Sequence, residues 1–159
     1  MNVHMGAIGF VQAARSAATD DFWGGQVSCI ALDEQFGAES LQGLGDFSHA
    51  EVLFLFHEVE PRKVVTGARH PRGNPEWPAV GIFAQRGKNR PNRIGSTICR
   101  IVAVEGTRLQ VAELDAIDGT PVLDIKPVIA EFLPREPVRQ PAWASDLMRD
   151  YWRPVPEGA

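Results

Sequence analysis

VGIFAQRGKNRPNRIGSTICRIVAVEG, residues 80–106, and RLQVAELDAIDGTPVLDIKP, residues 108–127, decide the fold of this chain. Apolar residues alternate with polar ones at the start of the second segment, which is typical of a half-buried β-strand. The turn at Gly106 between the segments predicts a β-hairpin. A loop with four basic residues in eight positions, residues 86–93, interrupts the first segment. This stretch therefore predicts antiparallel strands beside a cationic loop.

The remainder of the chain adds further strand-like segments and no alternation of strands with long helices. Asp33 is expected to cap a short helix that ends near residue 42. Residues 61–78 contain four prolines and are expected to form a functional or mobile loop. We predict a mainly β, single-domain antiparallel barrel of about seven strands, with a short helix and a proline-rich C-terminal tail. The predicted strands are residues 6–14, 26–32, 52–56, 79–85, 94–105, 108–114 and 121–128.

The 159 residues are enough for one domain with a substantial core. We expect residues 1–130 to form the barrel domain and residues 131–159 to form a tail, whose short helix begins at Pro141. Trp143, Leu147 and Tyr151 would share one face of that helix, and this face would pack either on the barrel or on a partner subunit.

Charge and cysteine content exclude several classes of protein. The net charge of −4 argues against a protein that coats nucleic acid, but it leaves room for a local basic patch. Cys29 and Cys99 lie in apolar runs and are expected to be free thiols in a reducing compartment. No spacing typical of a metal site, no membrane span and no signal peptide is recognisable, so a cytoplasmic protein that needs no metal is expected.

Three groups of residues are candidates for chemistry, and each has a structural alternative. The cationic loop suits phosphate or carboxylate ligands, or is a solvated hairpin. The Asp118–Pro121 turn, followed by Asp124 and Lys126 on one strand face, would serve a site or would be a β-turn and a structural ion pair. His57 ends an apolar strand, where acid–base groups often lie, although such a histidine is also often structural. The chain contains neither a Rossmann fingerprint nor a P-loop.

Four motifs taken together resemble a known family. GLxDFSHxEVxFxFHE, GIFAxR, RPNxIG and LDxxDGTPVLDIKP occur in this order between residues 43 and 127. They resemble the TsaA-like family, whose characterised members are tRNA methyltransferases of the O type. The resemblance covers residues 8 to about 128. It implies a β-barrel homodimer that binds S-adenosylmethionine and methylates N6 of threonylcarbamoyladenosine, at position 37 beside the tRNA anticodon.

The resemblance also implies roles for individual residues. His57 and Asp118 would be catalytic. Arg90, Asn92, Arg93 and Lys126 would contact tRNA. The residues expected to bind S-adenosylmethionine are Gly24, Gly25, Gln26, His57, Glu58, Arg86, Ser96, Asp118, Gly119, Thr120 and Pro121.

The chain departs from the family pattern inside the cationic loop. Gly87 and Lys88 stand where the family usually has Ser-Pro, Arg93 replaces a proline, and Ser96-Thr97 replaces Leu-Ser. These differences leave two alternatives open. One is a barrel that binds S-adenosylmethionine or a nucleotide without transferring a methyl group, and the other is a methyltransferase with a different acceptor.

Overall fold

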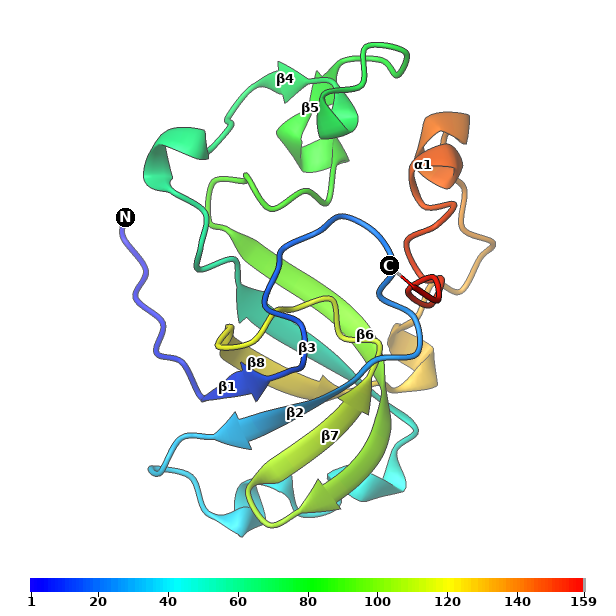
Figure 1. The fold of residues 1–159 in the computed structure, drawn as a ribbon. Coiled ribbons are helices and arrows are strands. Elements are labelled where there is room, and N and C mark those ends of the chain that lie inside the picture. The colour runs from blue at the N-terminus through cyan, green and yellow to red at the C-terminus, as the bar shows by residue number, and fades with distance from the viewer. Residues whose placement is uncertain (159) are drawn as a thin grey trace.

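Six antiparallel strands close into a barrel in the computed structural model, which describes residues 1–158 (Figure 1). The order around the barrel is β1-β2-β7-β6-β3-β8, and the pairing of β1 with β8 closes it. Closure leaves the barrel without a free sheet edge. The prediction of a mainly β antiparallel barrel is thereby confirmed. The strands are β1 Gly9–Gln12, β2 Val27–Leu32, β3 His49–Leu55, β6 Ile94–Glu105, β7 Arg108–Ala112 and β8 Pro121–Pro127.

The strand predicted at residues 79–85 is wrong for most of its length. Only Val80–Gly81 forms a strand, β5, and it pairs with β4, Ala68–Arg69, in a small hairpin outside the barrel. Ile82–Ala84 is a 3₁₀ turn instead. The buried Gln85 side chain explains this, because its amide donates hydrogen bonds back to the carbonyls of Arg69 and Val80, at 3.0 and 2.8 Å.

The helix predicted to follow Asp33 is also wrong. The Asp33 carboxylate accepts a hydrogen bond from the main-chain N–H of Gln35, and the residues that follow form a turn and not an α-helix. What remains is a 3₁₀ turn, Ala38–Leu41, between Gly37 and Gly43. A segment this short gains too few hydrogen bonds to offset the cost of nucleating an α-helix.

The barrel core contains the inward-facing residues of each strand. Phe54 on β3 is 1% exposed and packs edge-on against Phe56, with ring centroids 5.3 Å apart. Gly95 on β6 pairs with Phe54, and a Cβ there would lie 2.4 Å from the phenyl ring. Glycine is therefore required at this position by packing. The pairing of β6 with β7 is irregular at another point, because its register shifts between Ile101 and Ala103.

Three long connections between strands lie at the same end of the barrel. The strand directions place the β1–β2 loop, the β3–β6 connection and the β7–β8 loop at this end. A hydrogen bond from Phe56 N to Arg93 O, at 2.8 Å, closes the base of the β3–β6 connection, and one from Glu113 N to Gln26 O, at 2.8 Å, joins the β7–β8 loop to the β1–β2 loop. We call this the loop end of the barrel, and it consists of residues 13–26, 56–93 and 113–120.

The C-terminal segment contacts the loop end. Its helix α1, Ala142–Leu147, is shorter than expected and is followed by turns. Figure 1 shows the residues after α1 running beside the β1–β2 loop. Trp23 in that loop is 4% exposed, so it anchors the loop to the core, and the Arg15 guanidinium lies 3.7 Å from the centroid of its ring.

Main-chain hydrogen bonds join the C-terminal segment to the β1–β2 loop. They run from Phe22 N to Asp150 O (3.2 Å), from Trp23 N to Tyr151 O (2.8 Å) and from Gly24 N to Arg153 O (3.2 Å). The longest helix described, α1 with six residues, falls far short of a membrane-spanning helix.

Candidate functional site

The loop end brings most of the predicted site residues to one side of the barrel. Ser96 and Lys126 do not share this position, because both side chains point outward from the barrel wall. The Ser96 hydroxyl donates to Glu51 at 2.7 Å, and Lys126 forms an ion pair with Asp124. The structural ion pair proposed as an alternative for Asp124 and Lys126 is thus present. The predicted residues at the loop end are Gly24, Gly25, Gln26, His57, Glu58, Arg86, Arg90, Asn92, Arg93, Asp118, Gly119 and Thr120, and Pro121 follows directly as the first residue of β8.

The cationic loop is held in place by its own basic side chains. Each of the four donates a hydrogen bond to a main-chain carbonyl, and none forms an ion pair among residues 1–158. The loop is therefore fixed, and its positive charge is not neutralised by a carboxylate. Such an arrangement favours the binding of anions. The four bonds are Arg86 Nη2 to Ser96 O (2.5 Å), Lys88 Nζ to Ala18 O (3.3 Å), Arg90 Nη1 to Gln85 O (2.8 Å) and Arg93 Nη1 to Val59 O (2.9 Å).

The Asp118–Pro121 turn leads into β8 and is hydrogen-bonded to Val11 on β1. The Asp118 carboxylate accepts a hydrogen bond from the N–H of Ala13 at 3.0 Å. Gly119 has φ +76°, a left-handed conformation that favours glycine. The turn is well fixed, and Asp118 itself is exposed to ligands.

Asp115 is a polar residue of the loop end that sequence reasoning missed. Its carboxylate accepts hydrogen bonds from the hydroxyls of Thr97 and Tyr151, which come from β6 and from the C-terminal segment. Burial, followed by the charge of Asp115, raises the pKa of Tyr151, so the phenol remains a proton donor. The sequence offered one signal, since Asp115 belongs to the same LDxxDGTP motif as Asp118.

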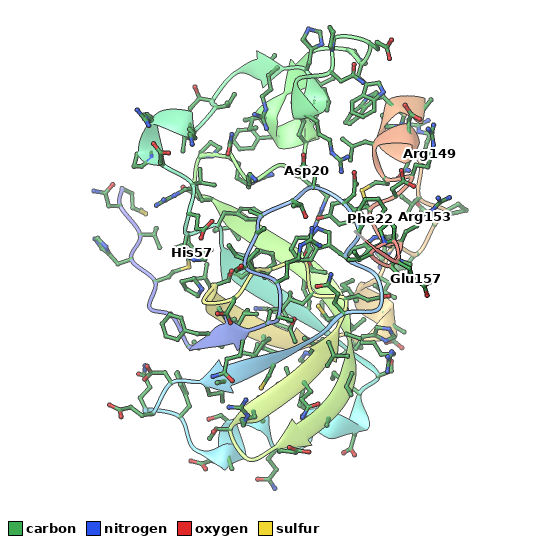
Figure 2. The ribbon with its side chains drawn as sticks, viewed as in Figure 1. Asp20, Phe22, His57, Arg149, Arg153 and Glu157 are labelled. Atoms are coloured by element: carbon green, nitrogen blue, oxygen red, sulfur yellow. The ribbon has the colours of Figure 1, made fainter. Side chains whose placement is uncertain are left out.

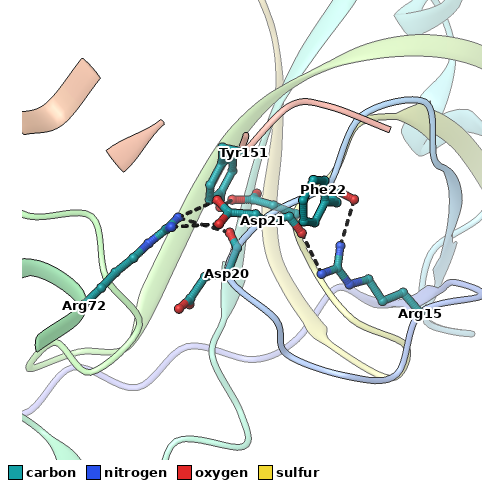
Figure 3. Close-up of polar contacts among 7 residues, drawn as sticks. Arg15, Asp20, Asp21, Phe22, Arg72 and Tyr151 are labelled. Atoms are coloured by element: carbon teal, nitrogen blue, oxygen red, sulfur yellow. Dashed lines mark hydrogen bonds and ion pairs between the residues drawn. The ribbon is translucent and has the colours of Figure 1, made fainter. Parts of the chain in front are cut away.

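A second polar network fixes the β1–β2 loop (Figure 3). The Arg72 guanidinium binds both carboxylate oxygens of Asp21, at 2.8 and 2.9 Å. Arg15 donates to the carbonyls of Asp21 and Phe22, at 2.9 and 3.1 Å. The pKa of Arg15 is lowered overall, because desolvation by burial lowers it more than the nearby Tyr151 and Asp21 raise it. The loop that carries Gly24 to Gln26 is thus fixed by two arginines and by the C-terminal segment.

His57 lies apart from this network. Figure 2 shows it on the other side of the loop end from Phe22 and Arg153. Its side chain is half-buried, and no hydrogen bond joins it to another predicted site residue among residues 1–158. Its role as a base stays a prediction. The part of the chain described here contains no group of three or more His, Cys, Asp or Glu residues arranged for a metal ion.

Two surface hollows lie outside the predicted site. One, of about 560 Å³, separates α1 from residues 76–78 and is lined by Trp77, Trp143 and Arg149 among others. The other, of about 620 Å³, follows residues 131–138. Neither is lined by a residue predicted to bind S-adenosylmethionine.

Asp115→Ala is expected to lower the free energy of unfolding by about 2–4 kcal/mol, because it leaves two largely buried hydroxyls without their acceptor. Denaturant unfolding measures the change. Asp118→Ala is the matched control, since it removes one exposed acceptor from the same loop and should cost about 1 kcal/mol or less. Equal losses in the two variants would contradict the structural role of Asp115.

The fold and the loop end together define a non-Rossmann β-barrel protein with a cationic loop at one end. Residues 20–132 match the family model of the tRNA-methyltransferase O N-terminal domain, and the chain belongs to this family. The resemblance noted from the sequence motifs is thereby confirmed.

The names of three relatives are consistent with this family. The chain is 38% identical over 115 residues to the human tRNA (adenine(37)-N6)-methyltransferase, which covers 72% of this chain and 26% of that protein. It is 38% identical over 118 residues to the Escherichia coli tRNA (adenine(37)-N6)-methyltransferase, covering 69% and 48%. It is 38% identical over 116 residues to a probable S-adenosyl-L-methionine-binding protein of Rhizobium radiobacter, covering 73% and 63%.

A solved structure shares the architecture. The crystal structure of TrmO from Pseudomonas aeruginosa superposes with a TM-score of 0.72 at 29% identity, covering 87% of this chain and 61% of that one. The chain spans about a fifth to a half of the length of the tRNA methyltransferases that it matches.

Proposed function

We propose that this chain is an S-adenosylmethionine-dependent methyltransferase that acts on N6 of adenosine 37 in tRNA, with threonylcarbamoyladenosine as the acceptor. The observation that carries the proposal is the cationic loop at the barrel's loop end, fixed by its own side chains and without carboxylate partners. Two relatives named for this reaction, from human and Escherichia coli, support it. Because tRNA modification would be its task, we also propose a cytoplasmic location.

The residues present suit S-adenosylmethionine. The cofactor carries a carboxylate and two cationic groups, so its site needs donors and acceptors together. Arg86 has no carboxylate partner among residues 1–158 and would bind the cofactor carboxylate. Asp118 is exposed beside the left-handed Gly119 and would face a cationic group of the cofactor. The donor set at the loop end therefore fits this ligand.

Methyl transfer needs positioning more than strong acid–base chemistry. When bound, S-adenosylmethionine supplies an electrophilic methyl group on a sulfonium. The fixed loops at Gly24 and Asp118 would orient the reacting groups, and His57 would accept the proton that leaves N6. An N6 between a carbonyl and a purine ring is acidic enough to need only a weak base such as imidazole. A His57→Ala protein that methylates at the wild-type rate would exclude this role.

The first test is the melting temperature with and without S-adenosylmethionine. A ligand that binds only the folded state at a hundred times its Kd adds about 2.7 kcal/mol of stability, which raises the melting temperature by several degrees. Transfer of labelled methyl groups to tRNA that carries threonylcarbamoyladenosine is then expected. No thermal shift at millimolar cofactor, with or without tRNA, would contradict the proposal.

Two other outcomes would identify the alternatives. A thermal shift without methyl transfer would indicate a binding protein, a possibility that the name of the Rhizobium radiobacter relative supports. Equal methylation of tRNA lacking the threonylcarbamoyl group would indicate a different acceptor.

A homodimer would complete the site. His57 lies apart from Phe22 of the β1–β2 loop in one chain (Figure 2), so a second copy would bring His57 of one subunit to this part of the loop of the other. Exposed apolar side chains such as Ile98 on β6, at 49%, and Phe132, at 88%, are available for such a contact. Light scattering that gives the monomer mass at micromolar concentration would exclude this arrangement.

A further inference from the structure

Arg69 lies beside the cationic loop, and its main chain is held firmly. It ends β4, pairs with Val80 on β5, and its carbonyl accepts a hydrogen bond from the buried Gln85 amide at 3.0 Å. The β4–β5 hairpin therefore fixes the point from which the Arg69 side chain starts.

The Arg69 side chain reaches the loop where Gly87 lies. Its Nη2 is 3.0 Å from the position that a Cβ at residue 87 would take. Gly87 is one of the departures from the family pattern, which usually has serine at this place. A serine side chain would require the Arg69 guanidinium to move, so glycine makes room for it.

The Arg69 guanidinium lacks the partners that neighbouring basic residues have. Its Nε is buried and makes no hydrogen bond among residues 1–158. Arg86 and Arg90 each donate to a main-chain carbonyl, and Arg72 is paired with Asp21. Buried donors without an acceptor are rare in folded proteins because each costs free energy.

The positive charge around Arg69 is a second reason to expect a bound anion. The four basic side chains of residues 86–93 form no ion pair in the part of the chain described, and Arg69 adds a fifth positive charge. Like charges in a partly buried setting repel one another unless an anion binds between them. A guanidinium is suited to bind two oxygens of a carboxylate or phosphate at once.

We propose that Arg69 is an oxyanion-binding residue of the loop end, made possible by Gly87. The ligand is an oxyanion bound between Arg69 and the cationic loop, either a phosphate of the RNA or the carboxylate of the cofactor. This inference rests on the proposed methyltransferase function and adds a specificity residue to it.

The experiment compares Arg69→Met with the wild type. Dissociation constants are measured for tRNA at several salt concentrations, for S-adenosylmethionine and for its decarboxylated analogue. Arg62→Met is the matched control, because Arg62 is a surface arginine whose side chain is 82% exposed and paired with Glu60. It should leave all three constants within about twofold of the wild type.

The arms of the experiment distinguish the two sources of the oxyanion. If the ligand is an RNA phosphate, Arg69→Met weakens tRNA binding about tenfold to a hundredfold and reduces the salt slope by about one, while cofactor binding is unchanged. If it is the cofactor carboxylate, S-adenosylmethionine binding weakens by a similar factor, and the variant no longer prefers it to the decarboxylated analogue. Wild-type affinity for both ligands in Arg69→Met would overturn the inference.

Gly87→Ser keeps the test valid if Arg69→Met does not fold. A serine Cβ 3.0 Å from Arg69 Nη2 shifts the guanidinium slightly without removing it, so the affected ligand should be the same and the loss smaller than in Arg69→Met. Wild-type affinity in Gly87→Ser would then overturn the inference. A wild-type protein that binds neither ligand would overturn the proposed function itself, which is a different result from a binding wild type whose affinity does not depend on Arg69.

Discussion

Phe54→Ala is expected to lower the free energy of unfolding by about 3–5 kcal/mol. Phe54 is 1% exposed, packs against Phe56 and covers Gly95 on the neighbouring strand. The substitution leaves a cavity where the phenyl ring was. Gly95 has no side chain that could fill this cavity. For a chain of this length the melting temperature should fall by about 10 °C or more. Urea unfolding and calorimetry measure the two quantities.

Phe83→Ala is the matched control for Phe54. Phe83 is 78% exposed, so its removal should change the free energy of unfolding by about 0.5 kcal/mol or less. Adding Gly95→Ala to Phe54→Ala should recover part of the lost stability, because the new methyl group occupies the cavity. Single Gly95→Ala should be destabilising, since its Cβ would lie 2.4 Å from the phenyl ring. A loss below about 1 kcal/mol in Phe54→Ala would contradict this account of the core.

Gly24→Ala is expected to detach the C-terminal segment from the β1–β2 loop. A Cβ at residue 24 would lie 2.0 Å from the carbonyl oxygen of Trp152, and main chain cannot yield as a flexible side chain does. Strain of this kind costs about 1–3 kcal/mol. Since we propose that this loop orients the reacting groups, its displacement should slow the proposed methyl transfer about a hundredfold. Limited proteolysis after residue 140 and a single-turnover methyl transfer assay measure the two effects.

Gly81→Ala is the control for Gly24→Ala, because no atom lies within 4 Å of its added Cβ and its φ is negative. It should leave both proteolysis and methyl transfer near wild-type values. Tyr151→Phe gives an intermediate case, since it removes the hydrogen bond to Asp115 and keeps the main-chain contacts. A Gly24→Ala protein as resistant to proteolysis as the wild type would show that the segment is not held there.

The barrel could be predicted from local sequence because proline- and glycine-containing turns mark where the strands begin and end. Residues 94–105 coincide with β6, which begins after a proline-containing loop and ends at Gly106. Local sequence failed where a single side chain redirects the main chain. The clearest case is Gln85, whose buried amide donates hydrogen bonds to the carbonyls of Arg69 and Val80, so that the strand ends early.

The candidate site could be predicted only in outline. The motifs indicated which loops form the candidate site. They did not indicate which of the two carboxylates, Asp115 or Asp118, points toward the protein interior. Asp115 and Asp118 are three residues apart, and the hydroxyl that distinguishes them comes from Tyr151, 36 residues further on. Nor does the charge of Arg90 and Arg93 show that their side chains hold main-chain carbonyls at 2.8 and 2.9 Å. These facts depend on tertiary contacts.

The contact between residues 22–24 and residues 150–153 has a consequence for the synthesis of the protein. At roughly 5–20 residues per second, a ribosome makes the second partner on the order of ten seconds after the first. Until then the N–H groups of Phe22, Trp23 and Gly24 lack the acceptors that they have in the finished fold. The barrel itself closes only when β8, Pro121–Pro127, has been made, so the nascent barrel carries an unfinished loop end until residues 150–153 follow.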